Sequence, residues 1–140
     1  MIKDNKFIVP VLRVLLGWLL FYAGITKVLD PAWTAAGYLN SAKFLPELFS
    51  WFASPAILPF TNFINEWGLT LVGVSLILGI GVRIFAVFGA VLMILYYLPR
   101  GFPKPDAHSY IVDSHIIYIL VLLYLASRAP RGWRPQKLIS

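Results

Sequence analysis

The feature that most constrains this chain is an apolar run over residues 7–29 that is long enough to cross a membrane. At a rise of about 1.5 Å per residue, a helix of this length spans a hydrocarbon core of roughly 30 Å. The run carries one cation near each end, Arg13 and Lys27. Helical periodicity places both cations on one stripe with Gly17 and Gly24. A simple membrane anchor does not need this pattern, so we expect the stripe to face a neighbouring helix.

Three further apolar runs predict three more membrane-spanning helices, over approximately 62–81, 84–98 and 110–127. Of the 140 residues, 59% are hydrophobic and only 13% are charged, which is typical of a polytopic membrane protein rather than a soluble one. No long polar or Pro/Gly/Ser-rich linker divides the chain. We therefore predict an all-α fold in one domain over residues 1–140, a bundle of four transmembrane helices. We expect the first helix to stay in the mature protein, because no small-residue cleavage pattern follows it.

The segment 32–61, between the first two predicted spans, is rich in aromatic residues and interrupted by prolines. No part of it has the uninterrupted apolar length that a spanning helix needs. We expect short helices at the membrane surface, such as one over residues 47–53. This aromatic interfacial loop would cap the bundle or receive a partner.

The charge pattern points to a membrane orientation rather than to nucleic acid. The net charge is +6, and four of the twelve cations lie in the tail 128–140, directly after the last apolar run. Because cytoplasmic loops are enriched in Lys and Arg, the pattern predicts a multi-pass protein of the cell membrane with both termini in the cytoplasm. Cysteine is absent, which excludes dithiol chemistry and Cys-ligated iron–sulfur clusters within this chain. A redox role would therefore need a bound cofactor or a partner protein.

Four ionisable residues are expected to meet at the outer end of the bundle, because successive helices alternate in direction. They are Lys27, Glu66, Asp113 and His115. Ionisable groups within a membrane usually face a cavity or pair with one another. In the functional interpretation they line an outward pocket that binds an anion or exchanges a proton with a quinone ring. In the structural interpretation, Lys27 and Glu66 form an ion pair between two helices and Asp113 caps the last helix.

His115 is the only histidine inside a predicted span. It could serve as a haem ligand, a proton carrier or a buried hydrogen-bond donor, and the last role is favoured because one histidine does not provide bis-histidine ligation. Asp113 and His115 lie about 200° apart on a helix, so the pattern predicts that they do not point at the same centre. No metal site is predicted. For Arg13, near the inner end, we expect the side chain to snorkel to the interface.

Three motifs resemble the DoxX/DoxD family of membrane proteins. The first runs from Arg13 through Gly17, Phe21, Gly24 and Lys27 to Asp30-Pro31, and looks like the opening signature of the family. The second, Glu66-Trp67-Gly68 through Gly73 and Gly79 to Arg83, resembles the second helix of the family. The third, Asp113-Ser114-His115 to Tyr118, is similar to the end of the DoxD branch, the membrane subunit of thiosulfate:quinone oxidoreductase.

The resemblance implies a four-helix membrane subunit that works with a second subunit to oxidise thiosulfate to tetrathionate and passes the electrons to membrane quinone. Under this hypothesis Lys27, Glu66 and His115 form the quinone pocket, and Asp113 joins them in catalysis. The alternative is a non-catalytic scaffold or assembly protein for a respiratory or redox complex, in which the same residues hold helices together and the aromatic loop docks a partner. The predicted partners are the lipid bilayer and a second oxidoreductase subunit or respiratory complex, with self-association left open and no nucleic acid.

Overall fold

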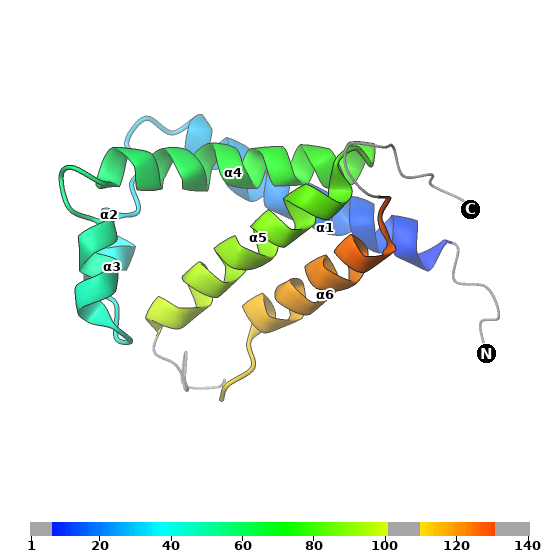
Figure 1. Ribbon diagram of the computed structural model, residues 1–140. Helices are drawn as coiled ribbons and strands as arrows, with labels where there is room; N and C mark the ends of the chain where they lie inside the picture. The colour runs from blue at the N-terminus through cyan, green and yellow to red at the C-terminus, as the bar shows by residue number, and fades with distance from the viewer. Residues whose placement is uncertain (1–6, 101–109, 131–140) are drawn as a thin grey trace.

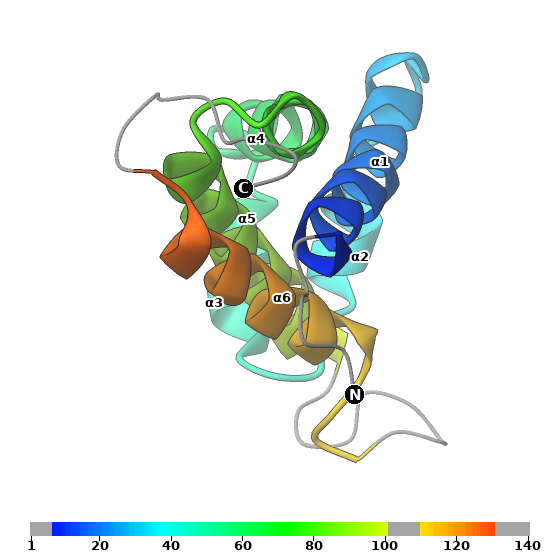
Figure 2. The same ribbon diagram turned by 90° about the vertical axis from the view of Figure 1, so that its right-hand side faces the viewer.

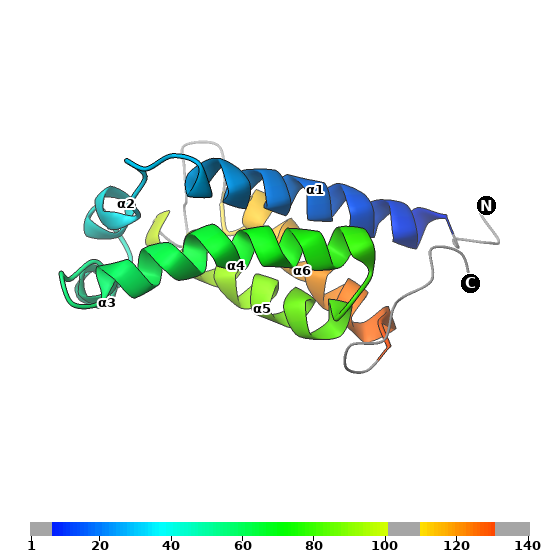
Figure 3. The same ribbon diagram turned by 90° about the horizontal axis from the view of Figure 1, so that it is seen from above.

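The computed structural model describes residues 7–100 and 110–130, and within these ranges the regular structure is entirely helical. Four long helices alternate in direction, and two short ones lie together at one end of the bundle (Figure 1). In chain order they are α1 (Ile8–Val28), α2 (Ala36–Asn40), α3 (Pro46–Phe52), α4 (Leu58–Leu78), α5 (Val82–Tyr97) and α6 (Ser114–Arg128), with a 3-10 turn η1 (Leu98–Arg100) after α5. The start of α1 and the end of α6 lie at the same end of the bundle, as predicted (Figure 3).

All four predicted long helices have different bounds in the structure, although the first differs by only one residue at each end. The second begins at Leu58 instead of residue 62, because Pro59 stands in the first turn, where a proline stabilises a helix start rather than breaking the helix. It ends at Leu78, and α5 begins at Val82, because Gly79 and Gly81 adopt left-handed conformations in the turn between them. The fourth begins at Ser114 rather than 110.

Helix α1 is the single helix in the described residues that is both long and apolar enough to cross a membrane by length and composition. Helices α5 and α6 are apolar but shorter, with 16 and 15 residues. Helix α4 has 21 residues, but its first half contains Thr61, Asn62, Asn65 and Glu66. An apolar all-helical bundle is thus established for the described residues.

Close contact between backbones holds α1 against α4. A methyl group added at Gly24 would lie 2.4 Å from the Thr70 backbone nitrogen, and one added at Gly73 would lie 2.4 Å from that of Phe21. At Gly17 the added carbon would lie 2.8 Å from Cβ of Leu76. Only glycine allows two helices to approach this closely. The prediction that Gly17 and Gly24 mark a helix contact line is therefore confirmed.

The other long helices form a second pair. Helix α5 packs chiefly on α6, α4 joins the two pairs through a smaller contact with α5, and α1 touches α6 only slightly (Figure 2). Leu122 and Leu125 of α6 are completely buried in the shared core. The Arg83 guanidinium donates a hydrogen bond of 3.1 Å to the Ala129 carbonyl, which ties the start of α5 to the end of α6.

The segment between α1 and α4 folds over the end of the bundle as α2 and α3. The predicted helix over 47–53 is confirmed as α3. Ala35, Leu39 and Phe49 form a small second core, against which Leu95 and Leu98 pack. The Asn62 side chain accepts a hydrogen bond of 2.9 Å from the Ala35 backbone and so fastens this segment to α4.

Arg13 departs from the predicted behaviour. The residue is only 1% exposed, so the prediction that it snorkels to the interface is wrong. It lies on the same face of α1 as Leu20 and Gly24, and this face turns into the bundle. The predicted basic tail lies outside the described residues from residue 131 onward.

Candidate functional site, an aromatic pocket at one end of the bundle

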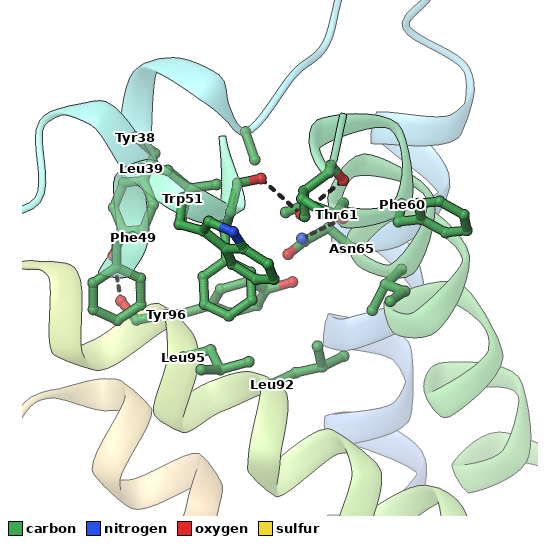
Figure 4. Close-up of a pocket in the computed structure, with 14 residues that line it drawn as sticks. Tyr38, Leu39, Phe49, Trp51, Phe60, Thr61, Asn65, Leu92, Leu95 and Tyr96 are labelled. Carbon is green, nitrogen blue, oxygen red and sulfur yellow. Dashed lines mark hydrogen bonds between the residues drawn. The ribbon is translucent and has the colours of Figure 1, made fainter. Parts of the chain in front are cut away.

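A pocket of about 220 Å³ lies between the α2–α3 segment, the first half of α4 and the end of α5 (Figure 4). Most of its lining is aromatic or aliphatic. The lining residues are Ala35, Tyr38, Leu39, Phe49, Trp51, Phe52, Ile57, Phe60, Thr61, Ile64, Asn65, Leu92, Leu95 and Tyr96. Helices α2 and α3 are short and lie across the ends of longer helices. They therefore cover a space that a bundle of the four long helices alone would leave open.

Thr61, Asn65 and Tyr96 are among the lining residues that carry polar groups. The Thr61 hydroxyl donates to the Phe52 carbonyl at 2.9 Å, and the Asn65 amide donates to the Thr61 carbonyl at 2.7 Å. The first bond connects the end of α3 to α4, and the second lies within α4. The Tyr96 hydroxyl is buried and has no hydrogen-bond partner in the described part of the chain. A buried polar group without a partner is rare in proteins, since it costs about 1–3 kcal/mol.

Tyr96 is held in place at its backbone and at its ring. The Tyr38 hydroxyl donates a hydrogen bond to the Tyr96 carbonyl. The His115 ring meets the Tyr96 ring edge to face, with centroids 6.3 Å apart and planes at 72°. Figure 4 shows the Tyr96 side chain reaching into the pocket from α5, while Asn65 approaches from α4.

Asp113 fixes the position of His115. One carboxylate oxygen of Asp113 accepts hydrogen bonds from the backbone nitrogens of His115 at 2.9 Å and Ile116 at 3.4 Å, which confirms the predicted helix cap. The other oxygen lies 3.1 Å from Nδ1 of His115. The prediction that these two side chains do not share a centre is wrong, because Asp113 stands before the helix in an extended conformation. The helical spacing of 100° per residue does not apply to it.

Lys27 and Glu66 are not paired. The Lys27 ammonium donates to the Ala23 carbonyl at 2.9 Å, one turn earlier in its own helix, and lies 5.6 Å from the centre of the Trp33 ring. No ion pair joins Lys27 to Glu66 among the described residues, so the predicted ion pair between the two helices is wrong. Glu66 is half-buried in α4, and its carbonyl accepts a bond from the Thr70 hydroxyl.

The structure therefore brings two of the four predicted site residues together, Asp113 and His115, directly behind the pocket wall. None of the four lines the pocket itself. Sequence reasoning missed Asn65 and Tyr96 as pocket residues because it ranked charged groups above neutral polar ones. The available signal was the density of aromatic residues in segment 32–61, together with Tyr96 on the inward stripe of its helix.

An apolar helical bundle that contains one helix of spanning length is typical of an integral membrane protein. The family model of DoxX matches residues 8–98, which covers α1 through α5 and more than half of the chain. This protein belongs to the DoxX family. No curated protein and no solved structure gives a match. The family match ends before α6, so it includes the pocket but not Asp113 or His115.

Proposed function

We propose that this chain is the multi-pass membrane subunit of a quinone-linked oxidoreductase, and that the ring of a membrane quinone binds in the aromatic pocket. The observation that carries the proposal is the pocket, with its apolar walls and the buried Tyr96 hydroxyl. Ligand sites are typically apolar cavities with a few polar groups that orient the ligand. An apolar cavity of about 150 Å³ binds benzene. A pocket of about 220 Å³ therefore has room for one substituted ring.

The exposed face of α4 is consistent with a ligand that has a long apolar tail. Phe60 and Ile64 line the pocket and are also 70% and 44% exposed. Trp67 and Leu71 follow them on the same exposed stripe, at spacings of three or four residues. In a membrane this stripe would face lipid chains. The isoprenoid tail of a quinone would leave the pocket past Phe60 and continue along this stripe.

The proposal includes four crossings, by α1, α4, α5 and α6, with both termini in the cytoplasm. The bias of Lys and Arg toward one side supports this orientation. Helices α5 and α6 rise only about 24 Å and 22 Å at 1.5 Å per residue, so a locally thinned bilayer or the residues flanking each helix would complete their crossings. The pocket would then lie at the outer side of the membrane.

The four residues singled out by the sequence keep a role in this proposal. The Lys27 ammonium contacts a carbonyl and an aromatic ring instead of a carboxylate, so it could attract an anion such as thiosulfate. Glu66 adjoins Asn65 in the chain and is the candidate for proton exchange. His115 and Asp113 support Tyr96 from behind.

The test is to purify the protein, measure bound quinone after solvent extraction, and assay thiosulfate-dependent reduction of a soluble quinone analogue with a candidate partner subunit. We expect co-purified quinone and turnover. Leu95→Trp, which fills the pocket, should remove both bound quinone and turnover, whereas Leu120→Trp on the exposed face of α6 should remove neither. Absence of both quinone and turnover in the unmodified protein would overturn the proposal.

The second candidate is a scaffold or assembly protein, and the exposed apolar surface of the α2–α3 segment favours it. Leu45 and Leu48 are about half exposed, outside the pocket lining. If this surface docks a partner, Leu48→Lys should abolish co-purification of that partner and leave quinone binding unchanged. Co-purification that survives this variant would count against the scaffold function.

A further inference from the structure

The Tyr96 hydroxyl gives the pocket a chemical preference beyond its size. Tyr96 lines the apolar pocket, and its hydroxyl is shielded from water and has no hydrogen-bond partner in the described residues. A ligand that is only a hydrocarbon would leave this hydroxyl unpaired. A ligand with an oxygen acceptor on its ring would satisfy it, and would regain the free energy that the unpaired group costs.

The contacts around Tyr96 hold this hydroxyl in place before a ligand arrives. The Tyr96 carbonyl is bonded by Tyr38, and the ring is supported by His115, which Asp113 holds in turn. A donor that is fixed in advance loses little conformational entropy when it binds a ligand. Tyr96 is therefore arranged to recognise one acceptor position.

Asn65 provides a second polar group in the pocket lining. Its amide nitrogen uses one hydrogen for the Thr61 carbonyl, which leaves the second hydrogen for a ligand. Asn65 comes from α4 and Tyr96 from α5, so the two groups approach the pocket from different helices (Figure 4). A para-quinone presents two carbonyl oxygens at opposite ends of its ring, which suits two donors on separate walls.

We infer that the pocket selects rings that carry carbonyl acceptors, with Tyr96 donating a hydrogen bond to one carbonyl and Asn65 donating to the other. This inference rests on the proposed function and names the chemical feature of the ligand that the site recognises. It makes Tyr96 and Asn65 the specificity-determining residues.

The experiment compares two probes that differ only in the carbonyl groups, 2-methyl-1,4-naphthoquinone and 2-methylnaphthalene. Binding of each to the full chain in lipid nanodiscs is measured by equilibrium partition, with empty nanodiscs subtracted. The unmodified protein should bind the quinone at least tenfold more tightly. Tyr96→Phe, which removes one oxygen atom, should weaken quinone binding about tenfold and leave binding of the hydrocarbon unchanged. Tyr124→Phe, on the exposed side of α6, is the matched control and should change neither.

The outcomes separate this inference from the function on which it rests. If both probes bind equally and Tyr96→Phe changes neither, the pocket binds a ring but the hydrogen-bond inference is wrong. If neither probe binds the unmodified protein, the proposed function fails and the inference fails with it. Asn65→Leu, similar in size to the amide, is the second variant and should also weaken binding of the quinone alone. A loss of binding for both probes in both variants would show a structural role instead.

Discussion

Asp113 uses its two carboxylate oxygens for two different tasks. One oxygen caps α6, and the other contacts the His115 imidazole. A serine in this position would still accept a bond from the backbone, but it has no second oxygen to reach the ring. Helix stability and support of the pocket wall can therefore be separated by substitution at a single position.

We expect Asp113→Ala to lower the free energy of unfolding by about 1 kcal/mol and Asp113→Ser to retain most of it, because serine is also a good helix cap. Both variants lose the contact to His115, so both should weaken binding of 2-methyl-1,4-naphthoquinone. Denaturation in detergent gives the stabilities, and partition into nanodiscs gives the affinities. Equal quinone binding in Asp113→Ser and the unmodified protein would show that the Asp113–His115 contact does not support the pocket.

Lys27 and Glu66 give a second test at the residue scale. Because no ion pair joins them among the described residues, Lys27→Met and Glu66→Gln should leave the thermal midpoint nearly unchanged. If both residues act in the reaction, each variant should abolish thiosulfate-dependent quinone reduction. A fall in the midpoint of several degrees with turnover preserved would instead assign them a structural role.

At the residue scale, the sequence was informative where a side chain acts on its own neighbours. The cap at Asp113 was predictable, since an acidic residue before an apolar run is a common helix start. The contact between Asp113 and His115 was not, because it depends on the extended conformation of Asp113. Pairing of Lys27 with Glu66 was predicted only from their similar depth in the membrane. Depth does not determine the direction in which a flexible lysine side chain points.

The α1–α4 interface depends on three small residues, and the approach is equally tight at Gly73 and at Gly24. A Cβ at Gly24 would lie 2.4 Å from the backbone of α4, which has no freedom to move aside as a flexible side chain would. We expect Gly24→Ala to destabilise the protein by about 1–3 kcal/mol through overpacking. The thermal midpoint in detergent measures this effect.

Gly37 in α2 is the matched control, because a Cβ added there meets nothing within 4 Å. Gly37→Ala should be neutral or slightly stabilising, since alanine favours helices more than glycine does. Equal midpoints for Gly24→Ala and Gly37→Ala would contradict the close packing of α1 on α4.

At the element scale, helical periodicity predicted the existence of all four long helices and the glycine contact line. It misplaced the start of α4 by four residues, because Pro59 was read as part of a loop although the first turn of a helix accepts proline. The start of α6 was also misplaced, since residues 110–112 are apolar but not helical. Apolar character alone does not distinguish a helix from the extended chain that leads into it.

The absence of cysteine makes the membrane topology of the whole molecule directly measurable. Single cysteines can be placed at Ser41, in the segment after α2, and at Ser140, the last residue. In intact cells a membrane-impermeant maleimide should label Ser41→Cys, while Ser140→Cys should react only after the membrane is permeabilised. Labelling of both positions in intact cells, or of Ser140→Cys alone, would contradict four crossings with cytoplasmic termini.

The pocket belongs to the whole molecule, and this explains why the sequence did not locate it. It is lined by α2, α3, α4 and α5 together, so it depends on how the aromatic segment folds back over the bundle. Local patterns predicted short helices in that segment but not the helices that they would cover. The charged residues were easier to single out, yet none of them is among the residues that line the pocket.

The central claim is that a quinone ring occupies the pocket between the α2–α3 segment, α4 and α5. The most direct measurement is photolabelling of the full chain in nanodiscs with an azido-quinone, followed by mass spectrometry of the labelled peptides. The label should appear in residues 35–65 and 92–96, and an excess of quinone without the azido group should prevent this labelling. Specific labelling around Lys27 or His115, with none in these two ranges, would contradict the claim.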